Sequence, residues 1–136
     1  MKINKKIIEL RYLMASEGIS AYLVPMKNNF LNNDLNPNEK RIKFISNFSG
    51  SAGILFIGNK KNSIFVDGRY TTQAKIEVDI TEIEVNVYNF QKQLDWLKAN
   101  LRDKSIIGFD SKLHSLDEIE RYEAGLKDKN ITLKPI

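Results

Sequence analysis

The 136-residue sequence contains no cysteine and only one histidine, and this removes several classes of chemistry. Without cysteine there is no disulfide scaffold, thiolate metal site or cysteine nucleophile. With a single histidine, a metal site would need clustered carboxylates, and no H-x-x-E-H, H-E-x-x-H or D-x-D pattern occurs. The histidine, His114, stands just before a helix-start signal, where we predict a surface loop residue.

Long apolar runs are also missing. No run approaches the roughly 18 residues that a membrane span needs, and the basic N-terminus is not followed by the apolar stretch of a signal peptide. The sequence has no G-x-S-x-G nucleophile elbow, and its glycines form no phosphate-binding loop. We therefore expect a cytoplasmic protein with no membrane partner.

A net charge of +4 raises the question of nucleic-acid binding. The lysines, however, are spread along the chain and mixed with 17 acidic residues. The densest pair, Lys60-Lys61, falls in a predicted turn. We interpret the charge as an ordinary solvated surface and expect no nucleic-acid partner.

The hydrophobic periodicity predicts a single α/β domain over residues 1–136, a length that supports a real core. Apolar residues recur at helical spacing up to Gly18, a natural helix end. Asn36-Pro37 is a second helix-start signal, Asp67 can cap a helix that begins near Arg69, and Ser115 opens a capping box. The predicted helices cover about 4–17, 37–45, 69–78, 90–101 and 116–126, and the predicted strands 21–24, 54–57, 64–66, 82–87, 106–109 and 131–133.

Helices that alternate with apolar strands indicate a sheet covered on both faces. The turn over 58–62 joins two strands as a hairpin, which makes the six-stranded sheet mixed. The prediction is a three-layer α/β/α domain.

Two aspartates and one arginine are the candidates for chemistry. Asp67 and Asp110 both follow predicted strands, at the edge where open α/β sheets bind ligands, and together they could hold a divalent metal as in nucleases. Asp67 as a helix cap and Asp110 as a loop residue are the simpler interpretations. Arg69 lies at the same rim, where its guanidinium could bind a carboxylate or a peptide carbonyl, or form a structural salt bridge.

Two segments, R-x-x-F-I-S-x-F-x-G-S-A-G over 41–53 and F-V-D-G-R-Y-x-x-Q-A over 65–74, resemble the N-terminal domain of aminopeptidase P, in the creatinase/prolidase family. The family often carries a D-x-H-x-x-E-Y segment after the first strand, and residues 26–34 lack its histidine and its E-Y pair. The motif residues besides Arg69 are Phe48, Gly50, Ser51, Gly53, Asp67, Gly68 and Tyr70.

The resemblance implies the creatinase N-terminal fold, with a ribonuclease H-like motif, and a role in an enzyme that removes N-terminal residues preceding proline. Such enzymes use two divalent metals, usually manganese, held in a C-terminal pita-bread domain, and none of those ligands belongs to this domain. The N-terminal domain helps wall the active site, limits substrate length and contributes to subunit contacts in a homo-oligomer. Arg69 is the family residue that reaches toward the Xaa-Pro peptide.

We therefore expect a non-catalytic domain whose partner is its own catalytic domain, and which hydrolyses nothing by itself. Two alternatives stay open at this point. One is a free-standing binding or oligomerisation module without peptidase activity. The other is a nucleic-acid enzyme that uses Asp67 and Asp110.

Overall fold

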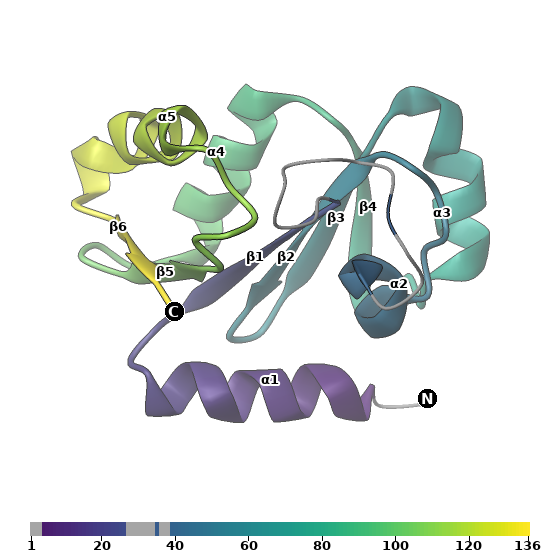
Figure 1. Ribbon diagram of the computed structural model, residues 1–136, viewed down its shortest axis with the longest axis horizontal. Helices are drawn as coiled ribbons and strands as arrows, with labels where there is room; N and C mark the ends of the chain where they lie inside the picture. Colours follow the sequence, from purple (N-terminus) through teal and green to yellow (C-terminus); the bar gives the residue numbers. More distant parts are fainter. Residues whose placement is uncertain (1–3, 27–34, 36–38) are drawn as a thin grey trace.

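The computed structural model describes residues 4–26, 35 and 39–136, and its centre is one six-stranded sheet (Figure 1). The strands are β1 (Ala21–Pro25), β2 (Gly53–Gly58), β3 (Asn62–Val66), β4 (Ile83–Val87), β5 (Ile106–Phe109) and β6 (Thr132–Pro135). The helices are α1 (Lys5–Ser16), α2 (Arg41–Ser46), α3 (Thr71–Glu77), α4 (Phe90–Asn100) and α5 (Leu116–Leu126), with short 3₁₀ turns at Gly68–Tyr70 and Lys127–Lys129.

The sheet has the order β4-β3-β2-β1-β5-β6 and is mixed, as predicted. Strand β2 pairs antiparallel with both β1 and β3, whereas the β3–β4, β1–β5 and β5–β6 pairs are parallel. The carboxyl ends of β1, β3, β4 and β5 consequently lie together at one end of the strands, which we call the carboxyl edge of the sheet. The β2–β3 turn lies at the opposite end of the strands.

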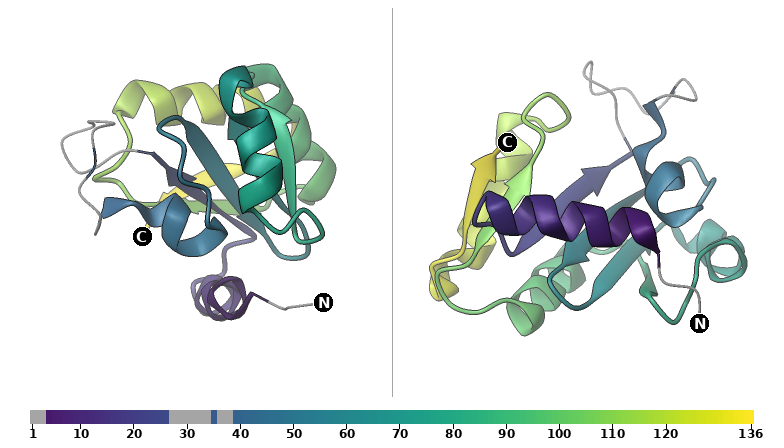
Figure 2. Two further views of the ribbon diagram at one scale, coloured as in Figure 1. Left: turned by 90° about the vertical axis from the view of Figure 1, so that its right-hand side faces the viewer. Right: turned by 90° about the horizontal axis from the view of Figure 1, so that it is seen from below.

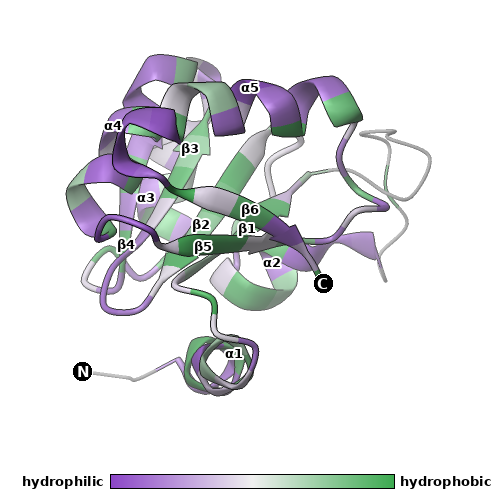
Figure 3. Ribbon diagram, turned by 90° about the vertical axis from the view of Figure 1, so that its left-hand side faces the viewer, coloured by the Kyte–Doolittle hydropathy of each residue, from purple (hydrophilic) through white to green (hydrophobic). Residues whose placement is uncertain are grey.

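Alternation along the strands builds two cores, one on each face of the sheet. Phe56 and Phe65 enter the core under α4 and α5, while their neighbours Leu55 and Ile64 enter the core under α1, α2 and α3. Figure 1 shows α4 and α5 on one side of the sheet and α1 and α2 on the other, with α3 beside β4, and Figure 2 shows the same arrangement from two other directions. Figure 3 shows mostly hydrophobic residues along the central strands and many hydrophilic residues on α3, α4 and α5. The predicted α/β/α layering is confirmed.

The local signals at the end of α1 and the start of α5 act where the sequence places them. Gly18 takes a left-handed φ of 71° after α1, and Ser115 accepts a hydrogen bond from Glu118 N at the start of α5. The predicted helix start at Asn36-Pro37 lies outside the described residues. The described helix α2 begins at Arg41, and Lys40 before it has a non-helical backbone and makes no side-chain cap hydrogen bond.

No helix in the described ranges is long and apolar enough to cross a lipid bilayer.

Candidate functional site

The two motif segments fold against each other beside the carboxyl edge of the sheet. Glu77, at the end of α3, accepts hydrogen bonds from the Ser49 amide at 2.9 Å and the Ser49 hydroxyl at 2.6 Å. Gln73 donates to both of these residues, at 3.0 Å to Ser49 Oγ and 3.1 Å to Glu77 Oε1. The Ser51 and Tyr70 hydroxyls lie 2.7 Å apart. These polar contacts tie the loop before β2 to the helix after β3.

Glu77 was not among the site residues predicted from the sequence. The hydrogen bonds from Ser49 stabilise the charged carboxylate and lower its pKa, with smaller help from Gln73 and Lys43. The signal in the sequence was the i,i+4 spacing of Gln73 and Glu77, which puts both side chains on one helix face.

Close packing explains two of the motif glycines, Gly50 and Gly53. A Cβ on Gly50 would overlap the buried Phe48 ring, with two ring carbons only 2.8 Å away. A Cβ on Gly53 would lie 3.0 Å from the carbonyl oxygen of Phe65. The Phe48 ring also meets Tyr70 edge-on, at 6.1 Å between centroids. These motif residues therefore have a packing role and support the segment that carries Asp67 and Arg69.

Asp67 and Arg69 form an ion pair at this rim. Asp67 Oδ1 accepts from the Arg69 amide at 2.9 Å and from Arg69 Nε at 3.0 Å. Hydrogen bonds from the Arg69 backbone and side chain lower the Asp67 pKa, and the Asp67 carboxylate raises the Arg69 pKa. The Arg69 side chain is 75% exposed, and within the described residues its two terminal nitrogens donate to nothing. The guanidinium is therefore oriented through Nε and keeps its outer edge available.

A pocket of about 350 Å³ lies beside this pair, at the carboxyl ends of β1, β3 and β4. It is the kind of position at which open α/β sheets bind ligands. Its border combines backbone and acidic or hydroxyl groups from distant segments: Gly53, Asp67, Gly68, Tyr88 and Glu118.

The structure does not support the alternative in which Asp67 and Asp110 share a metal. They follow β3 and β5, which stand three strand positions apart, or roughly 14 Å at about 4.8 Å per strand. Asp110 borders a separate, apolar pocket of about 400 Å³ between α1, α2 and the sheet. Across the described ranges, no group of three His, Cys, Asp or Glu side chains could hold a metal ion.

The prediction for His114 was wrong. Its side chain is fully buried, its Nδ1 lies 2.7 Å from Glu118 Oε1, and its ring meets Phe109 edge-on. Glu118, in the first turn of α5, supplies a hydrogen-bond partner for Nδ1 and so offsets part of the cost of burying the ring. The i,i+4 spacing of the two residues was the available signal.

The comparisons with known proteins agree on one domain type. The family model for the Creatinase/Prolidase N-terminal domain matches residues 6–136. The chain is 34% identical over 134 residues to Xaa-Pro aminopeptidase 1 of Dictyostelium discoideum, covering 97% of this chain and 21% of that protein. It is 31% identical over 126 residues to Xaa-Pro aminopeptidase 2 of Rattus norvegicus, covering 92% and 18%. The chain thus spans about a fifth of the length of these curated relatives.

Solved structures have the same fold as this chain. The X-prolyl aminopeptidase of Caenorhabditis elegans, a cytosolic enzyme with a di-nuclear active site, superimposes with a TM-score of 0.84 at 27% identity, over 98% of this chain and 24% of that one. The N-terminal domain of the cytoplasmic peptidase PepQ from Mycobacterium tuberculosis H37Rv gives 0.75 at 22% identity, over 98% and 94%, which shows the fold alone.

Proposed function

Because the chain belongs to the Creatinase/Prolidase N-terminal domain family, we propose that it is the non-catalytic N-terminal domain of a metal-dependent Xaa-Pro aminopeptidase. Relatives about five times longer, all named as Xaa-Pro aminopeptidases, support this assignment. The parent enzyme removes N-terminal residues that precede proline, acts in the cytoplasm and forms a homo-oligomer.

The metal centre of that enzyme belongs to another part of the protein. The described residues do not fit a pair of divalent metals, because they contain no cluster of three potential ligands. The C. elegans relative has a di-nuclear active site, and we assign a corresponding pair of ions, manganese by preference, to a C-terminal catalytic domain. This chain then contributes contacts to substrate and subunits rather than to the hydrolytic step.

Arg69 is the residue that we assign to the Xaa-Pro peptide. The observation that supports this role is its ion pair with Asp67, a residue that lines the pocket; the pair holds Arg69 Nε and leaves the exposed terminal nitrogens without a partner among the described residues. Two parallel N–H groups suit a carboxylate or a peptide carbonyl. In the assembled enzyme, this part of the rim becomes a wall of the active site and restricts the length of bound peptides.

Turnover of an Xaa-Pro tripeptide tests the proposal. The pure 136-residue chain with added Mn²⁺ should release no N-terminal residue, whereas the full-length native enzyme that contains this sequence should. Manganese-dependent turnover by the pure chain would overturn the non-catalytic assignment. An immunoblot of native extract tests the parent itself: a product near 15.7 kDa would favour the free-standing module.

A further inference from the structure

A basic hollow lies at the edge of the sheet opposite to the Asp67–Arg69 pair. Its volume is about 560 Å³, and it opens between the β2–β3 turn, the end of α4 and the residues just before β1 and β5. Three exposed cations line it, Lys60, Lys61 and Arg102, and none of the described residues that line it is acidic. Residues 58–61 and 99–105 meet here although about 40 residues separate them in the chain.

These three cations have no ion-pair partner in the described part of the chain. Among the described residues, no carboxylate lies within 4.0 Å of their nitrogens. The acidic side chains nearby are engaged elsewhere: Glu82 accepts from the Asn4 amide at 3.0 Å, and Glu84 accepts from the Trp96 indole at 3.1 Å.

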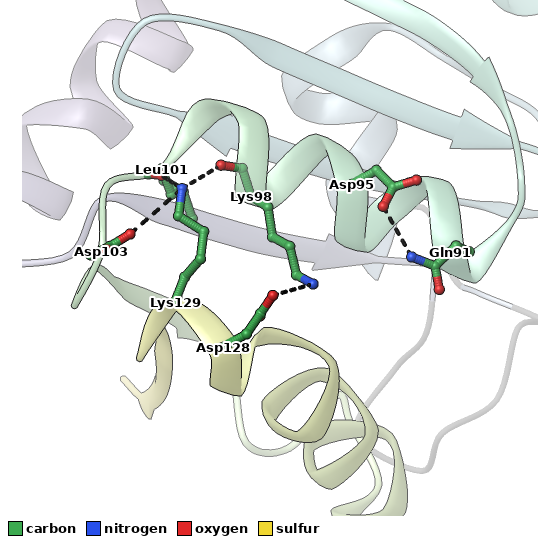
Figure 4. A network of polar contacts seen from close by, with 7 residues as sticks. All are labelled: Gln91, Asp95, Lys98, Leu101, Asp103, Asp128 and Lys129. Carbon is green, nitrogen blue, oxygen red and sulfur yellow. Dashed lines mark hydrogen bonds and ion pairs between the residues drawn. The ribbon is translucent and has the colours of Figure 1, made fainter.

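The C-terminus of α4 does not require these cations either. A helix C-terminus attracts positive charge because its last carbonyls are unpaired. Lys129 already meets that need, since its Nζ donates to the carbonyl oxygens of Lys98 at 2.7 Å and Leu101 at 2.8 Å (Figure 4). Asp103 lies 3.9 Å from the same Nζ, and Asp128 pairs with Lys98 at 3.1 Å. The positive charges of Arg102, Lys60 and Lys61 are therefore not needed to stabilise the local structure.

Three like charges around a concave surface repel one another and concentrate positive potential in the hollow. A bound anion removes that repulsion. Lysine ammonium groups act as point charges for phosphate, and an arginine fork binds its oxygens in pairs. The volume lies in the range of small-molecule sites, roughly 300–1,000 Å³, which favours a compact ligand over a long polymer.

We propose that the basic hollow, lined by Lys60, Lys61 and Arg102, binds a small anion that carries two or more negative charges on phosphate groups. This site is separate from the rim assigned to peptide, and its role does not depend on peptidase activity.

Titration of the ¹⁵N-labelled chain with inorganic pyrophosphate tests the proposal. Saturable shifts should concentrate in residues 58–61 and 99–105. The Arg102→Ala variant should weaken binding by about tenfold, the effect of one lost charge-assisted hydrogen bond, and the Lys60→Ala/Lys61→Ala variant, which removes two cations, by about tenfold or more. The matched control, Lys75→Ala/Lys112→Ala, removes two exposed charges outside the hollow and should change the dissociation constant less than twofold.

Three outcomes would overturn the site. The first is the absence of saturable shifts. The second is equal weakening by the control variant, which would indicate attraction by net charge alone. The third is preference for a nucleic acid: a 20-base-pair DNA duplex that shifts the same residues at much lower concentration than pyrophosphate. Thermal unfolding of each variant, unchanged within a few degrees, establishes that weakened binding does not reflect misfolding.

Discussion

Glu77 accepts two hydrogen bonds from Ser49, one from the backbone amide and one from the hydroxyl. This contact joins two parts of the chain that lie 28 residues apart. Between them run the β2–β3 hairpin and the Asp67–Arg69 turn, so the contact closes a loop around the candidate peptide-binding rim.

The Ser49–Glu77 contact should make the free energy of unfolding of the domain depend on pH in the acidic range. The pKa of Glu77 in the folded state is below its ordinary value of 4.5. The charged Glu77 side chain therefore contributes fully to the free energy of unfolding at pH values above 4.5, and this contribution disappears as the pH falls through the folded-state pKa. Glu77→Gln should therefore lower the urea midpoint at pH 7 and have a smaller effect near pH 3. An equal effect at both pH values would contradict this account.

Gly50→Ala should be strongly destabilising. The added methyl group overlaps the ring of Phe48, which is 0% exposed and cannot move without disturbing the core. Overpacking of this kind costs about 1–3 kcal/mol, measurable as a lower urea midpoint. Gly68→Ala is the matched control: it lies in the same motif and no heavy atom lies within 4 Å of its added Cβ. Equal losses in the two variants would show that the Phe48 contact does not explain the requirement for glycine.

Tyr122→Phe should reveal a buried polar pair. The Tyr122 hydroxyl donates to Gln93 Oε1 at 2.6 Å, and the two residues are 1% and 0% exposed. Its loss leaves a buried acceptor unpaired, at a cost of about 1–3 kcal/mol in the free energy of unfolding. The double variant Tyr122→Phe/Gln93→Leu should recover part of this cost. Tyr12→Phe, at a residue 75% exposed, should leave the free energy of unfolding unchanged, and a loss equal to that of Tyr122→Phe would refute the explanation.

Arg69→Ala in the full-length enzyme should lower kcat/KM for Xaa-Pro peptides by about tenfold or more, because a charge-assisted contact to substrate is lost. Arg69→Lys should rescue little of it, since an ammonium group cannot reproduce the two parallel donors. Arg121→Ala removes an arginine on α5 that packs over Phe90 and should leave kcat/KM unchanged. An unchanged kcat/KM for Arg69→Ala would contradict a contact between Arg69 and the substrate.

Much of the fold was predictable because its signals are local. The alternation along β2 and β3 required only that successive side chains point to opposite faces, and the caps at Gly18 and Ser115 depend on neighbouring residues. The start of α2 was less predictable: the sequence signal lies at Asn36-Pro37, outside the described residues, and the described helix begins at Arg41 without a side-chain cap.

The candidate site was predictable only in part. Asp67 and Arg69 were found because they are two residues apart and end a strand, so their pairing is a local event. The role of Arg69 toward peptide stays a prediction. His114 was predicted wrongly to lie on the surface. Its burial depends on its contact with Phe109 and on the packing of α5, and neither can be predicted from the residues next to it in the sequence.

The sequence by itself determined the secondary structure, the mixed sheet and the domain family, because periodicity, turn residues and a two-part motif are written in neighbouring positions. Only the tertiary structure decided which distant side chains share a surface. It separated Asp67 from Asp110 by the strand order, joined Ser49 to Glu77, and gathered Lys60, Lys61 and Arg102 around one hollow. The reason is physical: strand order and loop closure fix distances between remote residues, and those distances determine which charges interact.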